Sequence, residues 1–98
     1  YLIKLFMQHL IKEAIQKGLF VLYYQPKIDL ETKRVLSAEA LIRIQKQDGS
    51  IIYPNDFIPA SEKNGDIAKI DKWVFKRLVD DARYIYMLTG EGVNISFN

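Results

Sequence analysis

Residues 37–44 read SAEALIRI, and this stretch decides the fold because its side chains alternate between two kinds. Successive side chains of a β-strand point to opposite faces of the sheet. One face would be apolar, with Ala38, Ala40, Ile42 and Ile44. The other face would carry Glu39, Leu41 and Arg43. We therefore predict a strand that packs one face under helices and holds a carboxylate and a guanidinium on the other.

The segments before this strand indicate an α/β fold. Residues 2–17 have the apolar spacing of an amphipathic helix, which Gly18 would end. A β-hairpin is predicted over about 20–44, because the polar link at 29–34 is too short for a crossover and leaves two antiparallel strands. Pro26 has no amide hydrogen to donate, so the first strand should lie at a sheet edge or be distorted there.

A strand–helix–strand pattern follows, and the second strand of the hairpin is its first strand. Residues 51–65 contain two prolines and a glycine and are expected to hold only short helical turns. A long helix is predicted over about 66–89, with Asp66 as its N-cap, and a strand over 92–97. Two strands joined through a helix should be parallel, with a right-handed crossover.

Composition excludes several classes of protein. The 98 residues include 14 Lys and Arg against 12 Asp and Glu, a net charge of +2, which gives no electrostatic reason to expect a nucleic-acid polymer as partner. The absence of cysteine excludes disulfides, zinc–thiolate sites and cysteine nucleophiles. No apolar run reaches the roughly 18 residues of a membrane span.

Polar side chains on the predicted strands form the candidate site. If the strands at 37–44 and 92–97 are parallel neighbours, Glu39 and Asn94 project into one space beside Gln25 of the first strand. Carboxylate and amide oxygens suit a hard divalent cation such as Mg²⁺, Mn²⁺ or Ca²⁺. Two alternatives remain at this point: a structural ion pair between Glu39 and Arg43, and polar groups satisfied by buried water.

Five segments, in chain order, then carry a resemblance to a known family. They read YQPK at 24–27, EALIR at 39–43, FIPASEKNG at 57–65, IDKWV at 70–74 and VNIS at 93–96. Together they resemble the EAL domain, the bacterial cyclic di-GMP phosphodiesterase, over residues 20–98. The resemblance implies the N-terminal part of a TIM-like (β/α)8 barrel with an antiparallel first strand, and residues 1–98 as a single partial EAL-like domain.

The resemblance also implies roles for residues of this chain. Glu39 and Asn94 would be metal ligands for Mg²⁺ or Mn²⁺. Two cations in the family activate a water that attacks one phosphodiester bond, which gives the linear dinucleotide pGpG. Contacts to cyclic di-GMP would come from Gln25, Leu41 and Arg43. The family's lysine and later acidic ligands would lie beyond Asn98, so no catalytic residue is assigned within the chain.

The chain departs from the family directly after the signature. Ile44 stands where the family often has tryptophan, and a frequent His-Pro pair is missing, so we expect the loop before Gly49 to be built differently. A barrel of this type takes about 250 residues. We therefore expect the chain to be a piece of a longer protein, to lack phosphodiesterase activity by itself, and to associate through its bare strand edge, for example as a homodimer, or to be the ordered part of the longer chain.

Alternative functions stay open on the sequence. A catalytically degenerate cyclic di-GMP receptor or protein-interaction signalling module would have the same fold, and the later lysine and acidic ligands would decide between receptor and enzyme. An unrelated small α/β interaction domain would require five ordered matches to be coincidence. The resemblance further implies linked sensory or diguanylate-cyclase-type domains and a cytoplasmic location, even where segments absent from this chain anchor the full protein in a membrane.

Overall fold

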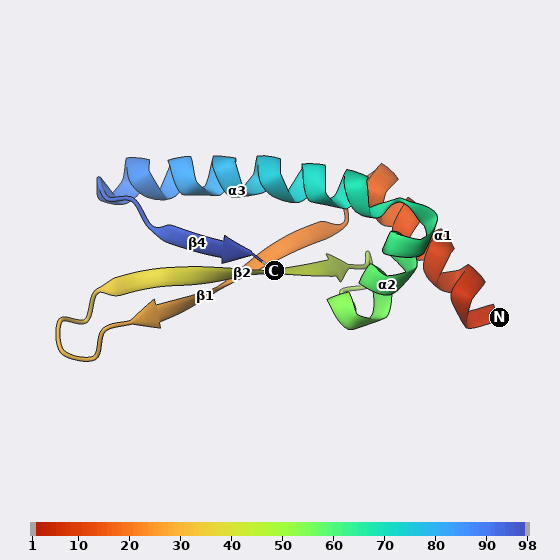
Figure 1. Ribbon diagram of the computed structural model, residues 1–98, viewed down its shortest axis with the longest axis horizontal. Coiled ribbons are helices and arrows are strands. Elements are labelled where there is room, and N and C mark those ends of the chain that lie inside the picture. Colours follow the sequence, from red (N-terminus) through yellow and green to blue (C-terminus); the bar gives the residue numbers. More distant parts are fainter. Residues whose placement is uncertain (1, 98) are drawn as a thin grey trace. The chain divides into compact units, whose positions relative to one another are not determined.

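The computed structural model describes residues 2–97, so Tyr1 and Asn98, the two ends of the predicted domain, lie outside the described residues. The elements follow one another as shown in Figure 1: α1 (Leu2–Lys17), β1 (Phe20–Ile28), β2 (Val35–Gln45), β3 (Ile51–Ile52), α2 (Pro54–Asn64), α3 (Ile67–Thr89) and β4 (Asn94–Phe97). The chain divides into two compact units: a first unit of Tyr1–Val21 with Ile42–Trp73, and a second unit of Leu22–Leu41 with Val74–Asn98.

Strand β2 is the common partner of the other strands. It is bonded to β1 and β3 along the sheet and pairs with β4 as well. The loop between β1 and β2 is closed by a 2.9 Å hydrogen bond from Asp29 N to Arg34 O, and the two strands run in opposite directions (Figure 1). β4 pairs with β2 in parallel. The predicted antiparallel and parallel pairings are both present, and β1, which contains Pro26, has β2 as its neighbour at the end of the strand order.

The alternation predicted for β2 is confirmed by its burial. Ala38, Ala40, Ile42 and Ile44 are buried, with at most 8% of each residue exposed. The residues between them are half-buried. The apolar face of β2 therefore belongs to the core, and its other face remains accessible to a ligand.

An aromatic cluster forms the centre of the first unit. The Phe20 ring lies 6.1 Å from the Phe57 ring and 5.7 Å from the Trp73 ring, both in tilted arrangements. Tilted contacts at these centroid distances are favourable beyond the area that they bury. Phe57 belongs to the segment 57–65 and Trp73 to the segment 70–74, two of the five segments that carry the resemblance. These two segments therefore contribute side chains to the core.

The prediction of only short helical turns over residues 51–65 is wrong, because α2 is a helix of 11 residues. Pro54 occupies the first turn, where a missing amide hydrogen removes no helical bond. Pro59 lies inside the helix, which is held by the fully buried Phe57 and by a 2.8 Å hydrogen bond from the Ser61 hydroxyl to the Phe57 carbonyl. Tertiary burial thus outweighs the cost of an interior proline.

Helix α1 spans the range predicted for it but buries less of its apolar stripe. Leu10, Ile11 and Ala14 are buried in the first unit. Ile3 and Phe6, which also lie on the predicted stripe, are 81% and 56% exposed. No helix within residues 2–97 combines the length and apolar character that crossing a bilayer requires.

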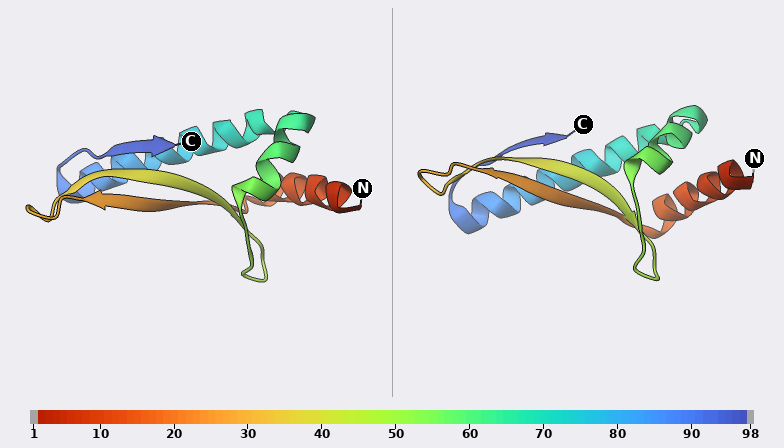
Figure 2. Two further views of the ribbon diagram at one scale, coloured as in Figure 1. Left: turned by 60° about the horizontal axis from the view of Figure 1, so that its bottom comes forward. Right: turned by 90° about the horizontal axis from the view of Figure 1, so that it is seen from below.

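In the second unit α3 lies along one face of the strands, as Figures 1 and 2 show. Tyr24 on β1 donates its hydroxyl hydrogen to Asp81 Oδ2 over 2.6 Å, and Arg77 Nε lies 3.3 Å from Asp81 Oδ1. Ala82 and Leu88 continue the three-or-four spacing of apolar residues along α3 in the sequence, but both are exposed. Asp81 points toward the sheet, since its carboxylate accepts the hydrogen bond from Tyr24 of β1.

The N-terminus of α3 begins where the sequence predicts. The Asp66 carbonyl accepts hydrogen bonds from Lys69 N at 3.0 Å and Ile70 N at 3.1 Å. Asp66 is buried, and its Oδ2 has no hydrogen-bond partner within residues 2–97. A carboxylate at this end of a helix is favoured by the helix dipole.

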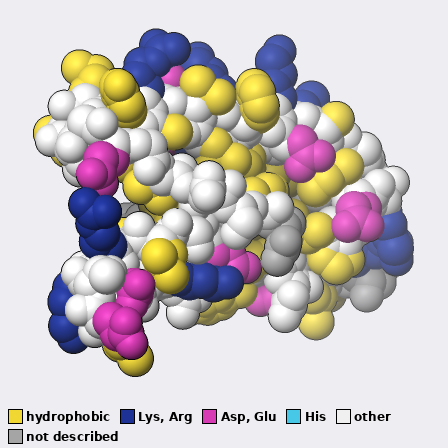
Figure 3. All heavy atoms as spheres, turned by 60° about the vertical axis from the view of Figure 1, so that its left-hand side comes forward, with side chains coloured by type: hydrophobic (Ala, Val, Ile, Leu, Met, Phe, Trp, Pro, Cys, Tyr) yellow, Lys and Arg dark blue, Asp and Glu magenta, His cyan; other side chains and the backbone are white. Residues whose placement is uncertain are grey.

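Large apolar side chains also lie at the surface. Figure 3 shows hydrophobic side chains among charged ones on the face that it draws. On α3 the exposed residues include Phe75, Tyr84, Tyr86, Met87 and Leu88. Such exposure marks surfaces that other protein segments can cover.

Phe57→Ala in the 98-residue chain is expected to lower the free energy of unfolding by about 3–5 kcal/mol, because it leaves a cavity beside Phe20. Phe75→Ala is the matched control: the same atoms are removed from a side chain that is 71% exposed, and the expected change is within about 0.5 kcal/mol. Urea unfolding of both variants measures the difference. Equal losses would contradict the assignment of Phe57 to the core.

Candidate cation and dinucleotide site

The register between β2 and β4 brings two predicted site residues to one face. Glu39 pairs with Ser96, and Ser37 pairs with Asn94. Paired residues of a parallel ladder project from the same face, so Glu39 and Asn94 share a face with the two serines. Asn94 lies two residues before Ser96, the residue directly opposite Glu39. The sequence prediction that Glu39 and Asn94 project to the same side therefore agrees with the strand register.

Gln25 lies on the same side of the sheet. Its neighbour Tyr24 reaches Asp81 of α3, so the alternation of β1 points Gln25 away from the helix. On β2 the helix-facing residues include Leu36 and Ala38, which line a groove with Tyr24. Glu39 alternates with these and therefore also points away from α3. The exposed Gln25 and the half-buried Glu39 thus belong to one polar face in the second unit.

The side-chain oxygens on this face are of the kind that binds a hard cation. They would fill only part of its coordination shell. Glu39 offers carboxylate oxygens and Asn94 an amide oxygen, which are ligands that Mg²⁺ and Mn²⁺ prefer. A hard cation takes about six oxygens. Within residues 2–97 no group of three or more histidine and acidic side chains could hold a metal ion. Glu39 and Asn94 by themselves would therefore fill only part of such a shell.

Arg43 lies in the first unit, on the half-buried face of β2. Its Nη1 donates a hydrogen bond to the Ile42 carbonyl over 2.8 Å, and its guanidinium carbon lies 4.9 Å from the centre of the Tyr53 ring. A cation at this distance from an aromatic ring is attracted by the ring quadrupole. Leu41, the remaining predicted contact, is half-buried one pleat earlier on the same strand.

Sequence reasoning missed Tyr53. A signal is present in the sequence, because Asp48-Gly49 is a turn dipeptide and a hairpin there would place the following residues beside the end of β2. The two-residue strand β3 was too short to be predicted from side-chain alternation. Its pairing with β2 is what brings Tyr53 beside Arg43.

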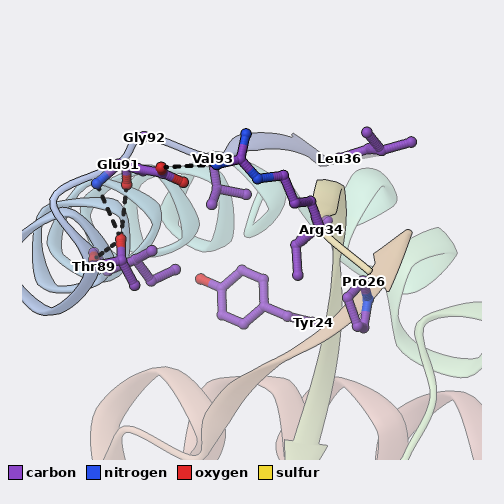
Figure 4. A pocket seen from close by; sticks show the side chains of 11 residues that line it. Tyr24, Pro26, Arg34, Leu36, Thr89, Glu91, Gly92 and Val93 are labelled. Atoms are coloured by element: carbon purple, nitrogen blue, oxygen red, sulfur yellow. Dashed lines mark hydrogen bonds and ion pairs between the residues drawn. The ribbon is translucent and has the colours of Figure 1, made fainter. Parts of the chain in front are cut away.

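A groove of the second unit lies on the other side of the sheet. It has a volume of about 670 Å³ and is mostly apolar, with Pro26, Leu36 and Val93 among its lining residues. Figure 4 shows the Tyr24 ring inside it and an ion pair of Arg34 with Glu91, at 3.8 Å, along its rim. None of the five predicted site residues lines this groove. The groove faces α3, so it is separate from the polar face.

Tyr24 is held in its protonated form. Burial raises the pKa of its hydroxyl, and the hydrogen bond to the Asp81 carboxylate and the negative charge of Asp81 raise the pKa further, while the positive charge of Arg77 lowers it. A tyrosine that keeps its proton retains its bond to α3 across the neutral pH range. This bond fixes the strand that carries Gln25.

Comparison with protein families gives one match along most of the chain. The family model described as "EAL domain" matches residues 9–98, through both units. Among curated proteins the chain is 34% identical over 96 residues to the signaling protein YkoW of Bacillus subtilis, covering 98% of this chain and 12% of that protein. It is 30% identical over 92 residues to the cyclic di-GMP phosphodiesterase NbdA of Pseudomonas aeruginosa, covering 94% of this chain and 12% of that protein.

Solved structures give the same likeness. The PaMucR phosphodiesterase in its c-di-GMP complex matches 94% of this chain and 37% of that chain, with a TM-score of 0.84 and 29% identity. The cGMP-bound EAL enzyme Bd1971 matches 97% of this chain and 28% of that chain, with a TM-score of 0.80 and 26% identity. These likenesses confirm the predicted fold class, the N-terminal part of a TIM-like barrel with an antiparallel first strand. The chain spans about an eighth of the length of the curated relatives it matches.

Tyr24→Phe is expected to destabilise the second unit by about 1–2 kcal/mol, because the Asp81 carboxylate loses a hydrogen bond. The raised pKa means that this stabilisation is fully present below the tyrosine's ordinary pKa of about 10 and declines as the pH rises above it. The difference in stability between the parent chain and Tyr24→Phe should therefore shrink above about pH 10.

The measurement is thermal unfolding of both chains across a pH series. Tyr84→Phe, on an exposed side chain of α3, is the control and should leave the unfolding temperature unchanged. A Tyr24→Phe difference that stays constant up to strongly alkaline pH would contradict the role of the tyrosine proton.

Proposed function

The chain belongs to the EAL domain family, and on that basis we propose that it forms the N-terminal part of a domain that binds cyclic di-GMP and hydrolyses it to linear pGpG. One observation carries this proposal. The family match over residues 9–98 includes the Glu39-Ala40-Leu41 signature, which lies in the middle of β2. Two relatives, NbdA and the Escherichia coli protein PdeR, are named cyclic di-GMP phosphodiesterases, which supports the same class of reaction.

In this proposal Glu39 and Asn94 hold a divalent cation, Mg²⁺ or Mn²⁺. The bound cation would polarise a phosphodiester oxygen and lower the pKa of a bound water. Glu39 contributes a negative charge and Asn94 a neutral oxygen from the neighbouring strand. Because both side chains stand on paired strands, their separation is set by the sheet, and the protein does not have to order a loop to bring them together.

The other three residues are proposed to bind the dinucleotide. The Arg43 guanidinium suits a phosphate, because its N–H groups match two oxygens at once. Gln25 offers both an acceptor and two donors from the exposed face of β1. Leu41 supplies an apolar contact on the strand that carries the signature. Each of these side chains is exposed or half-buried, so each can reach a ligand without a change of the core.

Further parts of the proposal concern the longer protein. We propose that the two units belong to one partial EAL-like domain, linked to sensory or diguanylate-cyclase-type domains and located in the cytoplasm. Residues 1–98 alone should lack phosphodiesterase activity, because Glu39 and Asn94 supply only part of a coordination shell. A receptor that binds cyclic di-GMP without cleaving it is the alternative.

The direct test uses the full-length protein with cyclic di-GMP and Mn²⁺, followed by chromatography of the products. Appearance of pGpG supports the phosphodiesterase. Tight binding with unchanged dinucleotide supports the receptor alternative. Neither binding nor cleavage would contradict both.

Glu39→Gln in the full-length protein should weaken Mn²⁺ binding by at least about tenfold and slow hydrolysis by about two orders of magnitude. The substitution keeps the shape of the side chain and removes its charge. Isothermal titration with Mn²⁺ and an assay of pGpG formation measure the two effects. Glu62→Gln, on the exposed face of α2, is the matched control and should change neither. Unchanged Mn²⁺ affinity in Glu39→Gln would refute its role as a ligand.

Arg43→Ala should weaken cyclic di-GMP binding by about 10- to 100-fold, the cost of losing a charged hydrogen bond, and leave Mn²⁺ affinity near that of the parent protein. Arg83→Ala, which removes an exposed arginine of α3, is the control. Titration calorimetry and the unfolding temperature are measured together. Retained dinucleotide affinity with a large loss of stability would favour the structural Glu39–Arg43 ion pair instead.

A further inference from the structure

The contact between Arg43 and Tyr53 is built by a local hairpin. Ile44 pairs with Ile52 and Gln45 with Ile51 in the antiparallel ladder of β2 and β3. One step further in the same register places Tyr53 opposite Arg43, with both side chains on the same face. The guanidinium carbon lies 4.9 Å from the centre of the ring. The pair is therefore a consequence of strand register.

The hairpin loop fixes that register without help from distant residues. Lys46 N donates to Ser50 O over 2.9 Å, and Asp48 Oδ1 accepts hydrogen bonds from both the backbone nitrogen and the hydroxyl of Ser50. Gly49 takes a φ of 90°, in the region that favours glycine. A closed turn of this kind gives only one alignment of the two-residue strand β3 with the end of β2.

The backbone of Tyr53 is constrained from its other side as well. Its φ and ψ are −92° and 155°, and its carbonyl accepts a hydrogen bond from Asp56 N over 3.0 Å at the start of α2. Pro54 follows directly and disfavours a helical conformation at the residue before it. Strand, turn and helix start together hold the backbone of Tyr53 in one conformation.

Tyr53 as a residue is 54% exposed, so it contributes little to the core. A cation–π contact restricts the long arginine side chain without using any of its five N–H donors. One of these donors, on Nη1, bonds to the Ile42 carbonyl. An arginine already held in one conformation loses less side-chain entropy when it binds an anion.

We propose that Tyr53 is a positioning residue that holds the Arg43 guanidinium in place for a phosphate of the dinucleotide. The inference rests on the proposed function, since it assigns Tyr53 to the binding of the same ligand through Arg43. It adds a residue that lies outside the signature and is brought to Arg43 by the β2–β3 hairpin.

A double-mutant cycle in the full-length protein tests this role. The variants are Tyr53→Leu, which keeps an apolar side chain and removes the ring, Arg43→Ala, and the combination of both. Tyr53→Phe keeps the ring and is the conservative variant. The dissociation constant of cyclic di-GMP is measured by titration calorimetry at low temperature, once with EDTA and once with Mn²⁺, together with Mn²⁺ affinity and the unfolding temperature.

Tyr53→Leu is expected to weaken cyclic di-GMP binding by about two- to fivefold, the effect of a partly exposed cation–π pair. Tyr53→Phe should bind like the parent protein, and Mn²⁺ affinity and unfolding temperature should stay unchanged in both. In the Arg43→Ala background, Tyr53→Leu should have no further effect, because the side chain that it positions is gone.

Three results would overturn the proposal. An equal loss from Tyr53→Leu with and without Arg43 would mean that the ring contacts the dinucleotide itself. A loss of Mn²⁺ affinity and unfolding temperature that accompanies the loss of binding would make Tyr53 a structural residue. Absence of cyclic di-GMP binding by the unsubstituted protein in both titrations would overturn the proposed function and the positioning role with it, before any variant is compared.

Discussion

The alternation of side chains along β2 is the constraint on which the rest of the structure depends. β2 pairs with all three other strands, so its register decides where each of them lies. Its alanines and isoleucines are buried, and its half-buried positions carry Glu39 and Arg43. A slip of one residue would exchange the two faces and bury the charged side chains at the cost of several kcal/mol each. The burial of four apolar residues therefore also fixes the direction of the polar ones.

The two units are stabilised in different ways. Within residues 2–97, the first unit has an aromatic cluster around Phe20 and eight buried hydrophobic residues, among them Phe57 and Ile70. In the second unit only Ala38, Ala40 and Val74 are buried hydrophobic residues among those that the structure describes. In the second unit the hydrogen bond from Tyr24 to Asp81 therefore provides a larger share of the interactions that hold α3 against the strands. A small apolar core depends more on its polar contacts, because each is a greater fraction of the marginal stability.

Much of this fold could be predicted because the decisive signals are local in sequence. Alternation predicted β2, and the length of the 29–34 link predicted the antiparallel pair. Helix α2 was missed because prolines argue against a helix, whereas the burial of Phe57 and the hydrogen bond from Ser61 to its carbonyl, which favour the helix, depend on the folded structure. Asp81 was likewise missed, since its place toward the sheet depends on Tyr24, 57 residues earlier. The sequence alone could not predict contacts between residues that are far apart in the chain, nor contacts that depend on a very short strand.

The residues of the candidate site also differ in how far the local sequence could predict their positions. Glu39, Leu41 and Arg43 could be predicted as one face of a strand, and their half-burial bears this out, because period-two alternation needs no knowledge of other segments. The position of Asn94 relative to Glu39 required the parallel register, and Tyr53 required the β3 pairing. Core residues and candidate site residues occupy opposite faces of β2, so substitutions on the polar face would leave the packing of the apolar face in place. In our proposal an enzyme and a receptor that has lost its later ligands would therefore share both this part of the fold and its polar face, and the later lysine and acidic ligands would distinguish the two.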